Sequence, residues 1–213
     1  GIERQRVLRN TYALLAVSMI PTVLGAWVGV ATGITSLMSP MVGLVVFLAG
    51  AFGFMFAIEK HKNSGLGVGL LLGFTFFMGL MLARLLAIVL SKGNGASLVM
   101  MAFAGTSAAF FGMAMLSSVI KRDLSGLAKF LFIGAIGILV VGIANVFIQS
   151  GALMMTLSVL AVLVFSAFIL VDLKRVRDGE ETNYVTATLG VYLSLYNVFQ
   201  SLLAMFGILG GED

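Results

Sequence analysis

The sequence predicts an all-α polytopic membrane protein, built as a bundle of seven transmembrane helices. Hydrophobic residues make up 60% of the 213 positions and charged residues only 10%, whereas soluble domains contain about 45–50% apolar and about 25% charged residues. Seven apolar runs are each long enough to cross a membrane as a helix, which takes about 20 residues. None of these runs shows the alternation that is typical of a β-barrel strand.

The apolar runs give the expected helix bounds and one transmembrane domain over residues 1–213. They fall at about 11–32, 41–58, 66–90, 96–119, 128–148, 152–172 and 184–208. Ser39 before Pro40 is typical of a helix start, and Asp123 can cap the fifth helix. Because the charged segment 3–6 leads into a run of full spanning length, we expect no cleavable signal peptide.

The basic residues predict the orientation of the chain. Eleven of the 13 fall on one side, in groups of three, two, three and three: Arg4, Arg6, Arg9; Lys60, Lys62; Lys121, Arg122, Lys129; and Lys174, Arg175, Arg177. The opposite loops hold only Lys92. Because cytoplasmic loops are enriched in Lys and Arg, we expect the amino terminus inside and, after seven helices, the carboxyl terminus outside. Because the basic residues serve topology in this way, the net charge of +4 does not indicate a nucleic-acid partner. We expect the protein to lie in a lipid bilayer and to bind no nucleic acid.

Pairs of glycines recur four residues apart within the predicted helices. They are Gly25 and Gly29 in the first run, and Gly69 and Gly73 in the third. Small residues let helix backbones approach closely where lipid supplies no hydrophobic driving force. We expect them to pack helices within the molecule, and consider a dimer interface the less favoured alternative.

Few polar groups lie at membrane depth, and Asp172 is the only acid inside an apolar run. It either pairs with Lys174 or Arg175 near the interface or is a functional buried acid. The seventh run has a polar face, because its polar and small residues recur at steps of three or four. These residues are Asn183, Thr186, Gly190, Ser194, Asn197 and Ser201. Such a face either hydrogen-bonds neighbouring helices or lines a water-filled path.

Three further polar residues have an open role at this point. Asn145 adds an amide to the fifth run, where it either completes a polar interior or forms hydrogen bonds with a neighbouring polar group. Arg84 in the third run is either a buried counter-ion or, as we favour, extends its charged end to the outer interface. His61, the only histidine, lies in a charged loop, where an exposed side chain is more typical than a proton switch.

The sequence contains no recognisable catalytic apparatus. It has no cysteine, no His-Glu-x-x-His zinc motif and no Gly-x-Ser-Gly nucleophile, and Asp172 lacks an intramembrane acid partner for aspartyl protease chemistry. We therefore expect no enzyme, no cofactor and no bound metal.

Three stretches together resemble the Bax inhibitor-1 family, also called the transmembrane Bax inhibitor motif family. They are residues 121–125 (KRDLS), residues 141–147 (VGIANVF), and the pair 165–173 (FSAFILVDL) with 191–199 (VYLSLYNVF). Residues 179–184 (GEETNY), followed by 192–197 (YLSLYN), resemble its bacterial branch, which contains YccA, a modulator of the FtsH protease. The resemblance implies a seven-helix fold in the bacterial inner membrane.

For characterised members the resemblance also implies a pH-sensitive calcium leak, controlled by two aspartates on the last two helices. Asp172 matches the first, but Ser194 stands where the second is expected. Two nearby carboxylates can share a proton, and a serine cannot replace that effect. In relatives a basic residue after the second helix pairs with the sensor; here Lys60, His61 and Lys62 occupy that stretch, and Arg84 is a further candidate.

Two functional hypotheses follow from this resemblance. The first is a pathway for calcium or other cations with Asp172 as its central acid, lined by Ser194, Asn197 and Asn145. The second is a regulatory partner of the FtsH protease, which would be engaged through the amino-terminal segment or the helix faces.

Overall fold

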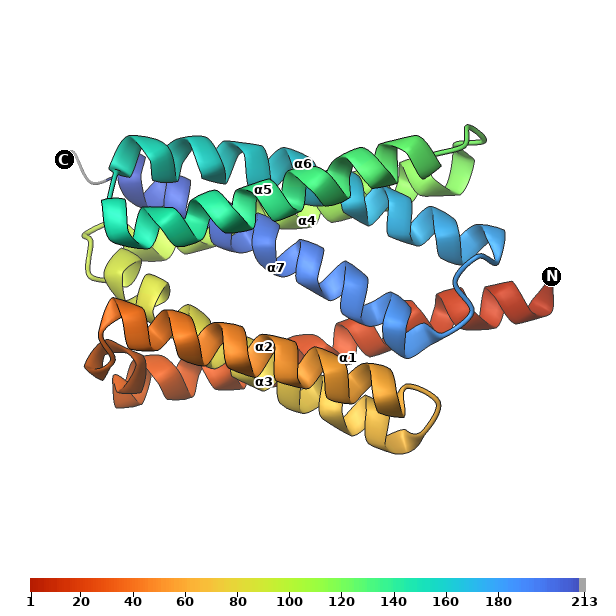
Figure 1. The fold of residues 1–213 in the computed structure, drawn as a ribbon, viewed down its shortest axis with the longest axis horizontal. Helices are drawn as coiled ribbons and strands as arrows, with labels where there is room; N and C mark the ends of the chain where they lie inside the picture. Colours follow the sequence, from red (N-terminus) through yellow and green to blue (C-terminus); the bar gives the residue numbers. More distant parts are fainter. Residues whose placement is uncertain (211–213) are drawn as a thin grey trace. The chain divides into compact units, whose positions relative to one another are not determined.

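In the computed structural model, which describes residues 1–210, the chain folds into α-helices, with no strand in that range (Figure 1). The elements are α1 (Ile2–Thr32), the short 3-10 helix η1 (Ile34–Leu37), α2 (Pro40–His61), α3 (Gly65–Leu90), α4 (Gly95–Val119), α5 (Ser125–Ile148), α6 (Gly151–Asp178) and α7 (Tyr184–Leu209). Within the described range, seven helices are long and apolar enough to cross a membrane. This confirms the predicted all-α, seven-helix fold class.

Two helices extend well beyond their apolar runs, so two of the predicted bounds are wrong. α1 begins at Ile2 rather than near residue 11, and α6 continues to Asp178 rather than ending near residue 172. An apolar run marks the part of a helix that crosses the membrane, whereas Arg, Lys and Glu are good helix formers that continue the helix into water. The 31 residues of α1 span about 46 Å, against about 30 Å of hydrocarbon.

The predicted start signals act as expected at two helices. Ser39 accepts a hydrogen bond from the backbone N–H of Val42 at 3.2 Å, and Pro40 is the first residue of α2. At α5, Leu124 holds the N-cap position, and Asp123 Oδ1 accepts from the backbone N–H of Ser125 at 3.0 Å. The Asp123 carboxylate thus satisfies one of the free N–H groups at the start of α5.

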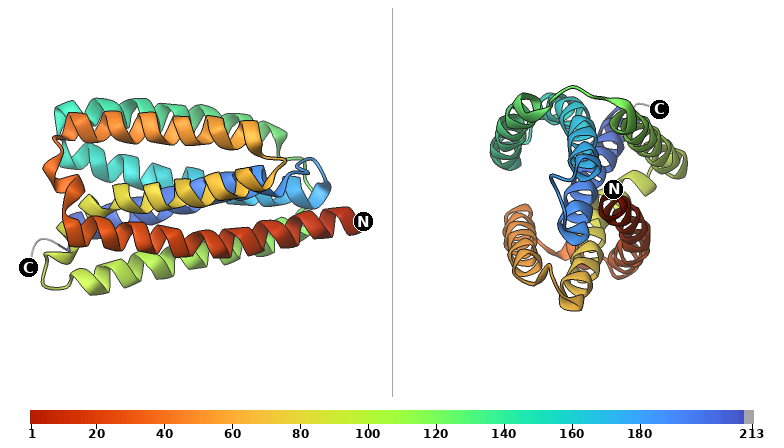
Figure 2. Two further views of the ribbon diagram at one scale, coloured as in Figure 1. Left: turned by 90° about the horizontal axis from the view of Figure 1, so that it is seen from below. Right: turned by 90° about the vertical axis from the view of Figure 1, so that its right-hand side faces the viewer.

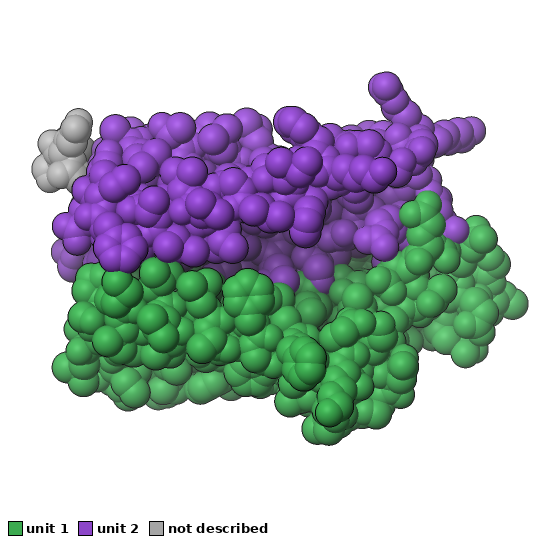
Figure 3. All heavy atoms as spheres, in the orientation of Figure 1, with its two compact units in different colours: residues 1–87, 179–189 green, residues 88–178, 190–213 purple. Residues whose placement is uncertain are grey.

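The chain divides into two compact units (Figure 3). Unit 1 contains residues 1–87 and 179–189, and unit 2 contains residues 88–178 and 190–213. Helix α7 belongs to both, because its first turns lie in unit 1 and the remainder in unit 2. The expectation of a single transmembrane domain stays a prediction.

Unit 1 is organised by close contact between α1 and α3. A Cβ atom on Gly25 would collide with the backbone oxygen of Phe76, and one on Gly79 would collide with that of Thr22. The prediction of intramolecular packing is therefore confirmed for Gly25, and equally for Gly29, whose Cβ would meet the Ala83 side chain. It is wrong for Gly69, around which a Cβ would meet nothing within 4 Å.

Unit 2 is organised around α6, which packs against both α4 and α5. Figure 2 shows α6 between these two helices, with the α4–α5 connection passing over its carboxyl-terminal end. Leu170, Val171 and Leu173 of α6 are buried. Asp172 therefore lies within a buried stretch of α6, the central helix of this unit.

Candidate functional site

Asp172 lies against a glycine of the next helix. In unit 2, a Cβ atom built on Gly190 of α7 would lie 3.1 Å from Asp172 Oδ2 and 3.6 Å from its Cγ. Asp172 is half-buried. Gly190 belongs to the polar face predicted for the seventh helix, so the acid of α6 does face that stripe. The absence of a side chain at residue 190 leaves the space that the carboxylate occupies.

Ser194 and Asn197 follow Gly190 along α7. Ser194 lies one helical turn beyond Gly190 and is buried. Asn197 is half-buried, and its Nδ2 donates to the backbone oxygen of Leu193 at 2.7 Å. At least part of the Asn197 amide therefore binds its own helix, while Ser194 is buried one turn beyond the glycine that Asp172 contacts.

Asn145 belongs to a different part of unit 2. Its Nδ2 donates to the backbone oxygen of Ser150 at 3.2 Å, and its Oδ1 accepts from the Ser150 N–H at 3.0 Å. These bonds close the turn between α5 and α6. Asp172 lies 22 residues after Ser150 along α6, so about 33 Å of helix separates Asp172 from this turn. The structure thus places Asn145 and Asp172 towards opposite ends of α6.

The four candidate basic partners of Asp172 all lie in unit 1, and three have local partners there. Lys62 Nζ lies 2.5 Å from Glu59 Oε1, and this hydrogen bond raises the pKa of Lys62. His61 Nδ1 lies 2.9 Å from the backbone oxygen of Ala57. Arg84 Nη1 donates to the Met38 oxygen at 3.3 Å, in the connection before α2, and Lys60 is exposed. A pairing of any of them with Asp172 stays a prediction.

The structure also contains a charged network that the sequence analysis missed. At the end of α6, Lys174 Nζ lies 2.7 Å from Asp178 Oδ2, and Arg177 Nε lies 2.9 Å from Asp178 Oδ1. The Arg177 guanidinium also donates to the backbone oxygens of Ser117 and Ile120, with the Ile120 bond at 2.7 Å. The four-residue step from Lys174 to Asp178 was visible in the sequence, but the predicted helix ended before it.

Asn183 was predicted to begin the polar face of the seventh helix, and the structure gives it a capping role. Its Oδ1 accepts from the N–H groups of Val185 and Thr186, both at 3.0 Å. Its Nδ2 donates to the backbone oxygen of Lys62 at 3.1 Å and to Asn63 Oδ1 at 3.0 Å. This single amide starts α7 and ties it to the α2–α3 connection.

The ionisable group at the contact with Gly190 is the carboxylate of Asp172. A carboxylate is a ligand that suits a hard cation or a transferable proton. Among residues 1–210, no three His, Asp or Glu side chains come together as metal ligands. The contact can thus attract a cation or a proton, but a closed metal centre is not formed by the described residues.

Comparison with known proteins agrees with this architecture. Residues 4–211 match the family model described as "Inhibitor of apoptosis-promoting Bax1". The chain is 36% identical over 206 residues to the Escherichia coli protein named "Modulator of FtsH protease YccA", covering 97% of the chain and 91% of that protein. It is also 36% identical over 212 residues to an uncharacterised Vibrio cholerae membrane protein, covering 100% of the chain and 93% of that protein.

The sequence resemblance is thereby confirmed over nearly the whole chain. A further relative from Escherichia coli, also 36% identical, is named "Inner membrane protein YccA", which agrees with the seven helices of membrane-spanning length. The chain belongs to the Bax inhibitor-1 family and is a multi-pass protein of the bacterial inner membrane.

Proposed function

We propose that this protein modulates an FtsH-type membrane protease. The observation that carries the proposal is its 36% identity, over 97% of the chain, to a protein named as a modulator of FtsH. The match extends over 206 residues and covers 91% of that protein, so the resemblance is not confined to one short motif. The protein would act by binding the protease within the membrane and limiting its access to other membrane substrates.

The amino-terminal end of α1 is the accessible segment for such an interaction. α1 is about 16 Å longer than the hydrocarbon layer is thick, and Figure 2 shows its amino-terminal end extending past the α2–α3 connection of unit 1. Residues 1–6 and Arg9 are exposed. With the basic residues on the cytoplasmic side, this end of α1 would project towards the protease domain of a partner anchored in the same membrane.

Co-purification from native membranes in mild detergent tests this proposal. We expect the protease to be recovered with the wild-type protein, and less of it with the double variant Arg6→Gln/Arg9→Gln. The matched control is Lys121→Gln/Arg122→Gln, which removes the same charge from exposed residues of unit 2 and is expected to retain the protease. Failure of the wild-type protein to retain it in native membranes would contradict the proposal.

A second function, a cation leak, is favoured by one specific contact. The Asp172 carboxylate meets α7 at Gly190, one turn from the buried Ser194. An acid in a helix–helix contact at membrane depth is costly and is typical of ion or proton pathways. We propose that Asp172 is the central acid of such a pathway, and that Ser194 in place of a second acid weakens its response to pH.

Calcium flux into liposomes that contain the purified protein, measured between pH 6 and pH 8, tests this second function. We expect Asp172→Asn to alter the flux and Ser194→Asp to strengthen its dependence on pH, because two nearby carboxylates can share a proton. Asp123→Asn is the matched control, since Asp123 lies in the exposed α4–α5 connection. A flux unchanged by Asp172→Asn would rule out the pathway.

A further inference from the structure

A cluster of basic residues surrounds the α4–α5 connection, away from the contact between Asp172 and Gly190. Lys121 and Arg122 lie in the connection itself, Lys129 lies near the start of α5, and all three side chains are exposed. Since a helix rises 1.5 Å per residue, Lys129 is about 6 Å along α5 from Ser125. Lys121, Arg122 and Lys129 are named the basic cluster below.

No acid within the described residues pairs with the basic cluster. Two other basic residues at this end of unit 2 do have an acidic partner, because Lys174 and Arg177 both bind Asp178. Asp123 lies within the connection, but its oxygens accept hydrogen bonds from Ser125. Three cations against one engaged carboxylate leave the connection with a formal charge of +2.

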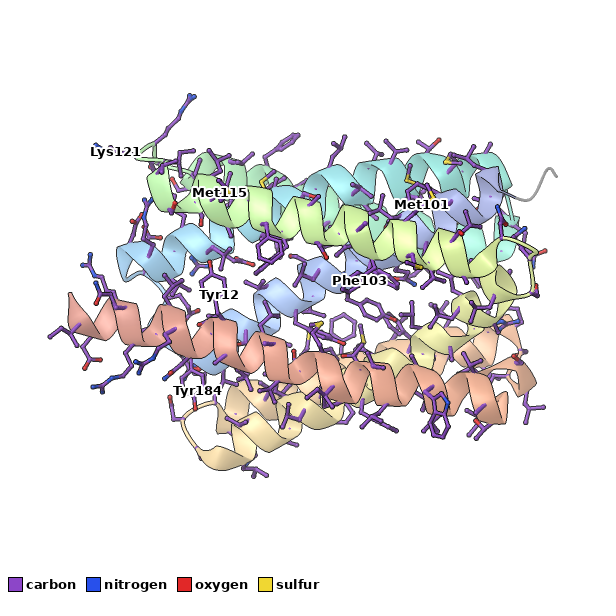
Figure 4. The ribbon with its side chains drawn as sticks, turned by 180° about the vertical axis from the view of Figure 1, so that it is seen from behind. Tyr12, Met101, Phe103, Met115, Lys121 and Tyr184 are labelled. Carbon is purple, nitrogen blue, oxygen red and sulfur yellow. The ribbon has the colours of Figure 1, made fainter. Side chains whose placement is uncertain are left out.

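Apolar side chains adjoin the basic cluster. Val119 at the end of α4 is 67% exposed, and Phe130 and Ile133 of α5 are each 70% exposed. Figure 4 shows Lys121 at the end of α4 that carries Met115, with Phe103 and Met101 further along the helix. In a membrane protein, exposed side chains of this kind contact lipid acyl chains. The basic cluster therefore lies where the hydrocarbon layer meets the headgroups.

We propose that the basic cluster binds the headgroups of anionic phospholipids, whose acyl chains lie along the exposed faces of α4 and α5. A lipid phosphate supplies the missing negative charge at the depth where the cluster lies, and basic residues beside a membrane span are a recognised feature of anionic-lipid binding. Arg122 can donate two parallel hydrogen bonds to a phosphate, while Lys121 and Lys129 add point charges.

The connection is held in place before any lipid binds. Arg177 donates to the backbone oxygens of Ser117 and Ile120, and Asp123 holds the start of α5 through Ser125. The backbone on both sides of Lys121 and Arg122 is thus fixed, which lowers the ordering cost of binding a headgroup. The proposal does not depend on the function proposed above, because it concerns a lipid and a separate set of residues.

Native mass spectrometry of the full-length protein, titrated with phosphatidylglycerol in detergent, tests the proposal. The test variant is Lys121→Gln/Arg122→Gln/Lys129→Gln. The matched control, Arg4→Gln/Arg6→Gln/Arg9→Gln, removes the same formal charge from the exposed start of α1. Thermal unfolding of both variants in the same detergent verifies that they fold.

We expect the test variant to bind phosphatidylglycerol of the order of 100-fold more weakly than wild type, from the usual contribution of each basic residue near a membrane. The control is expected to lose less than roughly threefold, because distant charges are screened. Phosphatidylcholine and free glycerol phosphate are expected to bind weakly to all three proteins. Equal losses in both variants, or equal binding of phosphatidylcholine and phosphatidylglycerol, would overturn the proposal.

Discussion

Arg177 Nη2 donates a hydrogen bond to the backbone oxygen of Ile120 at 2.7 Å, and so joins the end of α6 to the end of α4. The same guanidinium donates to the Ser117 oxygen, and its Nε binds Asp178. The last carbonyl groups of a helix have no partner within that helix, so Arg177 supplies donors that α4 itself cannot. The Arg177 side chain thus supplies hydrogen-bond donors to the backbone oxygens at the end of α4 and holds the connection that leads to α5.

Replacing Arg177 with Gln is expected to destabilise unit 2. The change leaves two partly enclosed backbone oxygens without their charged donor, which typically costs about 1.5–3 kcal/mol for each hydrogen bond to a charged group. Thermal unfolding in detergent measures the effect. Arg9→Gln, at an exposed position of α1, is the control and is expected to change little. Equal unfolding temperatures for the two variants would show that the Arg177 bonds contribute nothing.

A side chain at residue 190 is expected to disturb Asp172. In Gly190→Ala the new Cβ would lie 3.1 Å from Asp172 Oδ2, so the carboxylate must shift, and Gly190→Val adds more crowding, with a typical cost of about 1–3 kcal/mol. The double variant Gly190→Val/Asp172→Ala is expected to recover part of that loss in thermal unfolding. Gly137→Ala on α5, where a Cβ would meet nothing within 4 Å, is the control. No recovery in the double variant would place the strain elsewhere.

Gly79→Ala is expected to separate α1 from α3. Its Cβ would meet the backbone of Thr22, with the carbonyl carbon at 2.8 Å and the Ala26 nitrogen at 3.0 Å. Backbone atoms cannot rotate away, so we expect a loss of about 1–3 kcal/mol, as in other overpacked cores. Gly69→Ala on the same helix has open space and is expected to be neutral or to gain up to about 1 kcal/mol. Similar thermal stability for both variants would argue against the close α1–α3 contact.

The pKa of Asp123 is expected to depend on Ser125. The backbone N–H and the hydroxyl of Ser125 both donate to the carboxylate and lower its pKa below the usual 3.8. A lowered folded-state pKa means that the carboxylate stabilises the start of α5 at neutral pH, and that this contribution is lost as the pH falls through that value. Carboxyl-carbon NMR titration is expected to show a higher pKa in Ser125→Ala, though still below 3.8 because the backbone bond remains. An unchanged pKa would contradict the role of the hydroxyl.

The sequence predicts the helices better than it predicts their ends. Apolar runs locate every membrane span because burial in lipid requires them, and Ser39 with Pro40 marks the start of α2 as expected. An apolar run ends where charged residues begin, so hydropathy misses the amino-terminal turns of α1 and residues 173–178 of α6. Only the helical spacing of Lys174 and Asp178 could have extended α6.

The candidate site was predicted in part. The periodicity of the seventh run placed Gly190 and Ser194 on one face, and Asp172 does meet that face at Gly190. The sequence could not show that Asn145 closes a turn with Ser150, because a hydrogen bond depends on the local backbone geometry. The contacts of Arg177 with Ser117 and Ile120 are equally hidden, since they join residues about 60 positions apart and depend on how α4 packs on α6.

The most direct test of the central claim is the rate at which a purified FtsH-type protease degrades a membrane substrate in liposomes. The substrate and protease are held constant while this protein is added at increasing ratios, and an unrelated seven-helix membrane protein serves as the control for crowding. We predict that degradation slows with the wild-type protein, slows less with Arg6→Gln/Arg9→Gln, and is unchanged by the unrelated protein. A rate that stays the same at every ratio of the wild-type protein would contradict the claim.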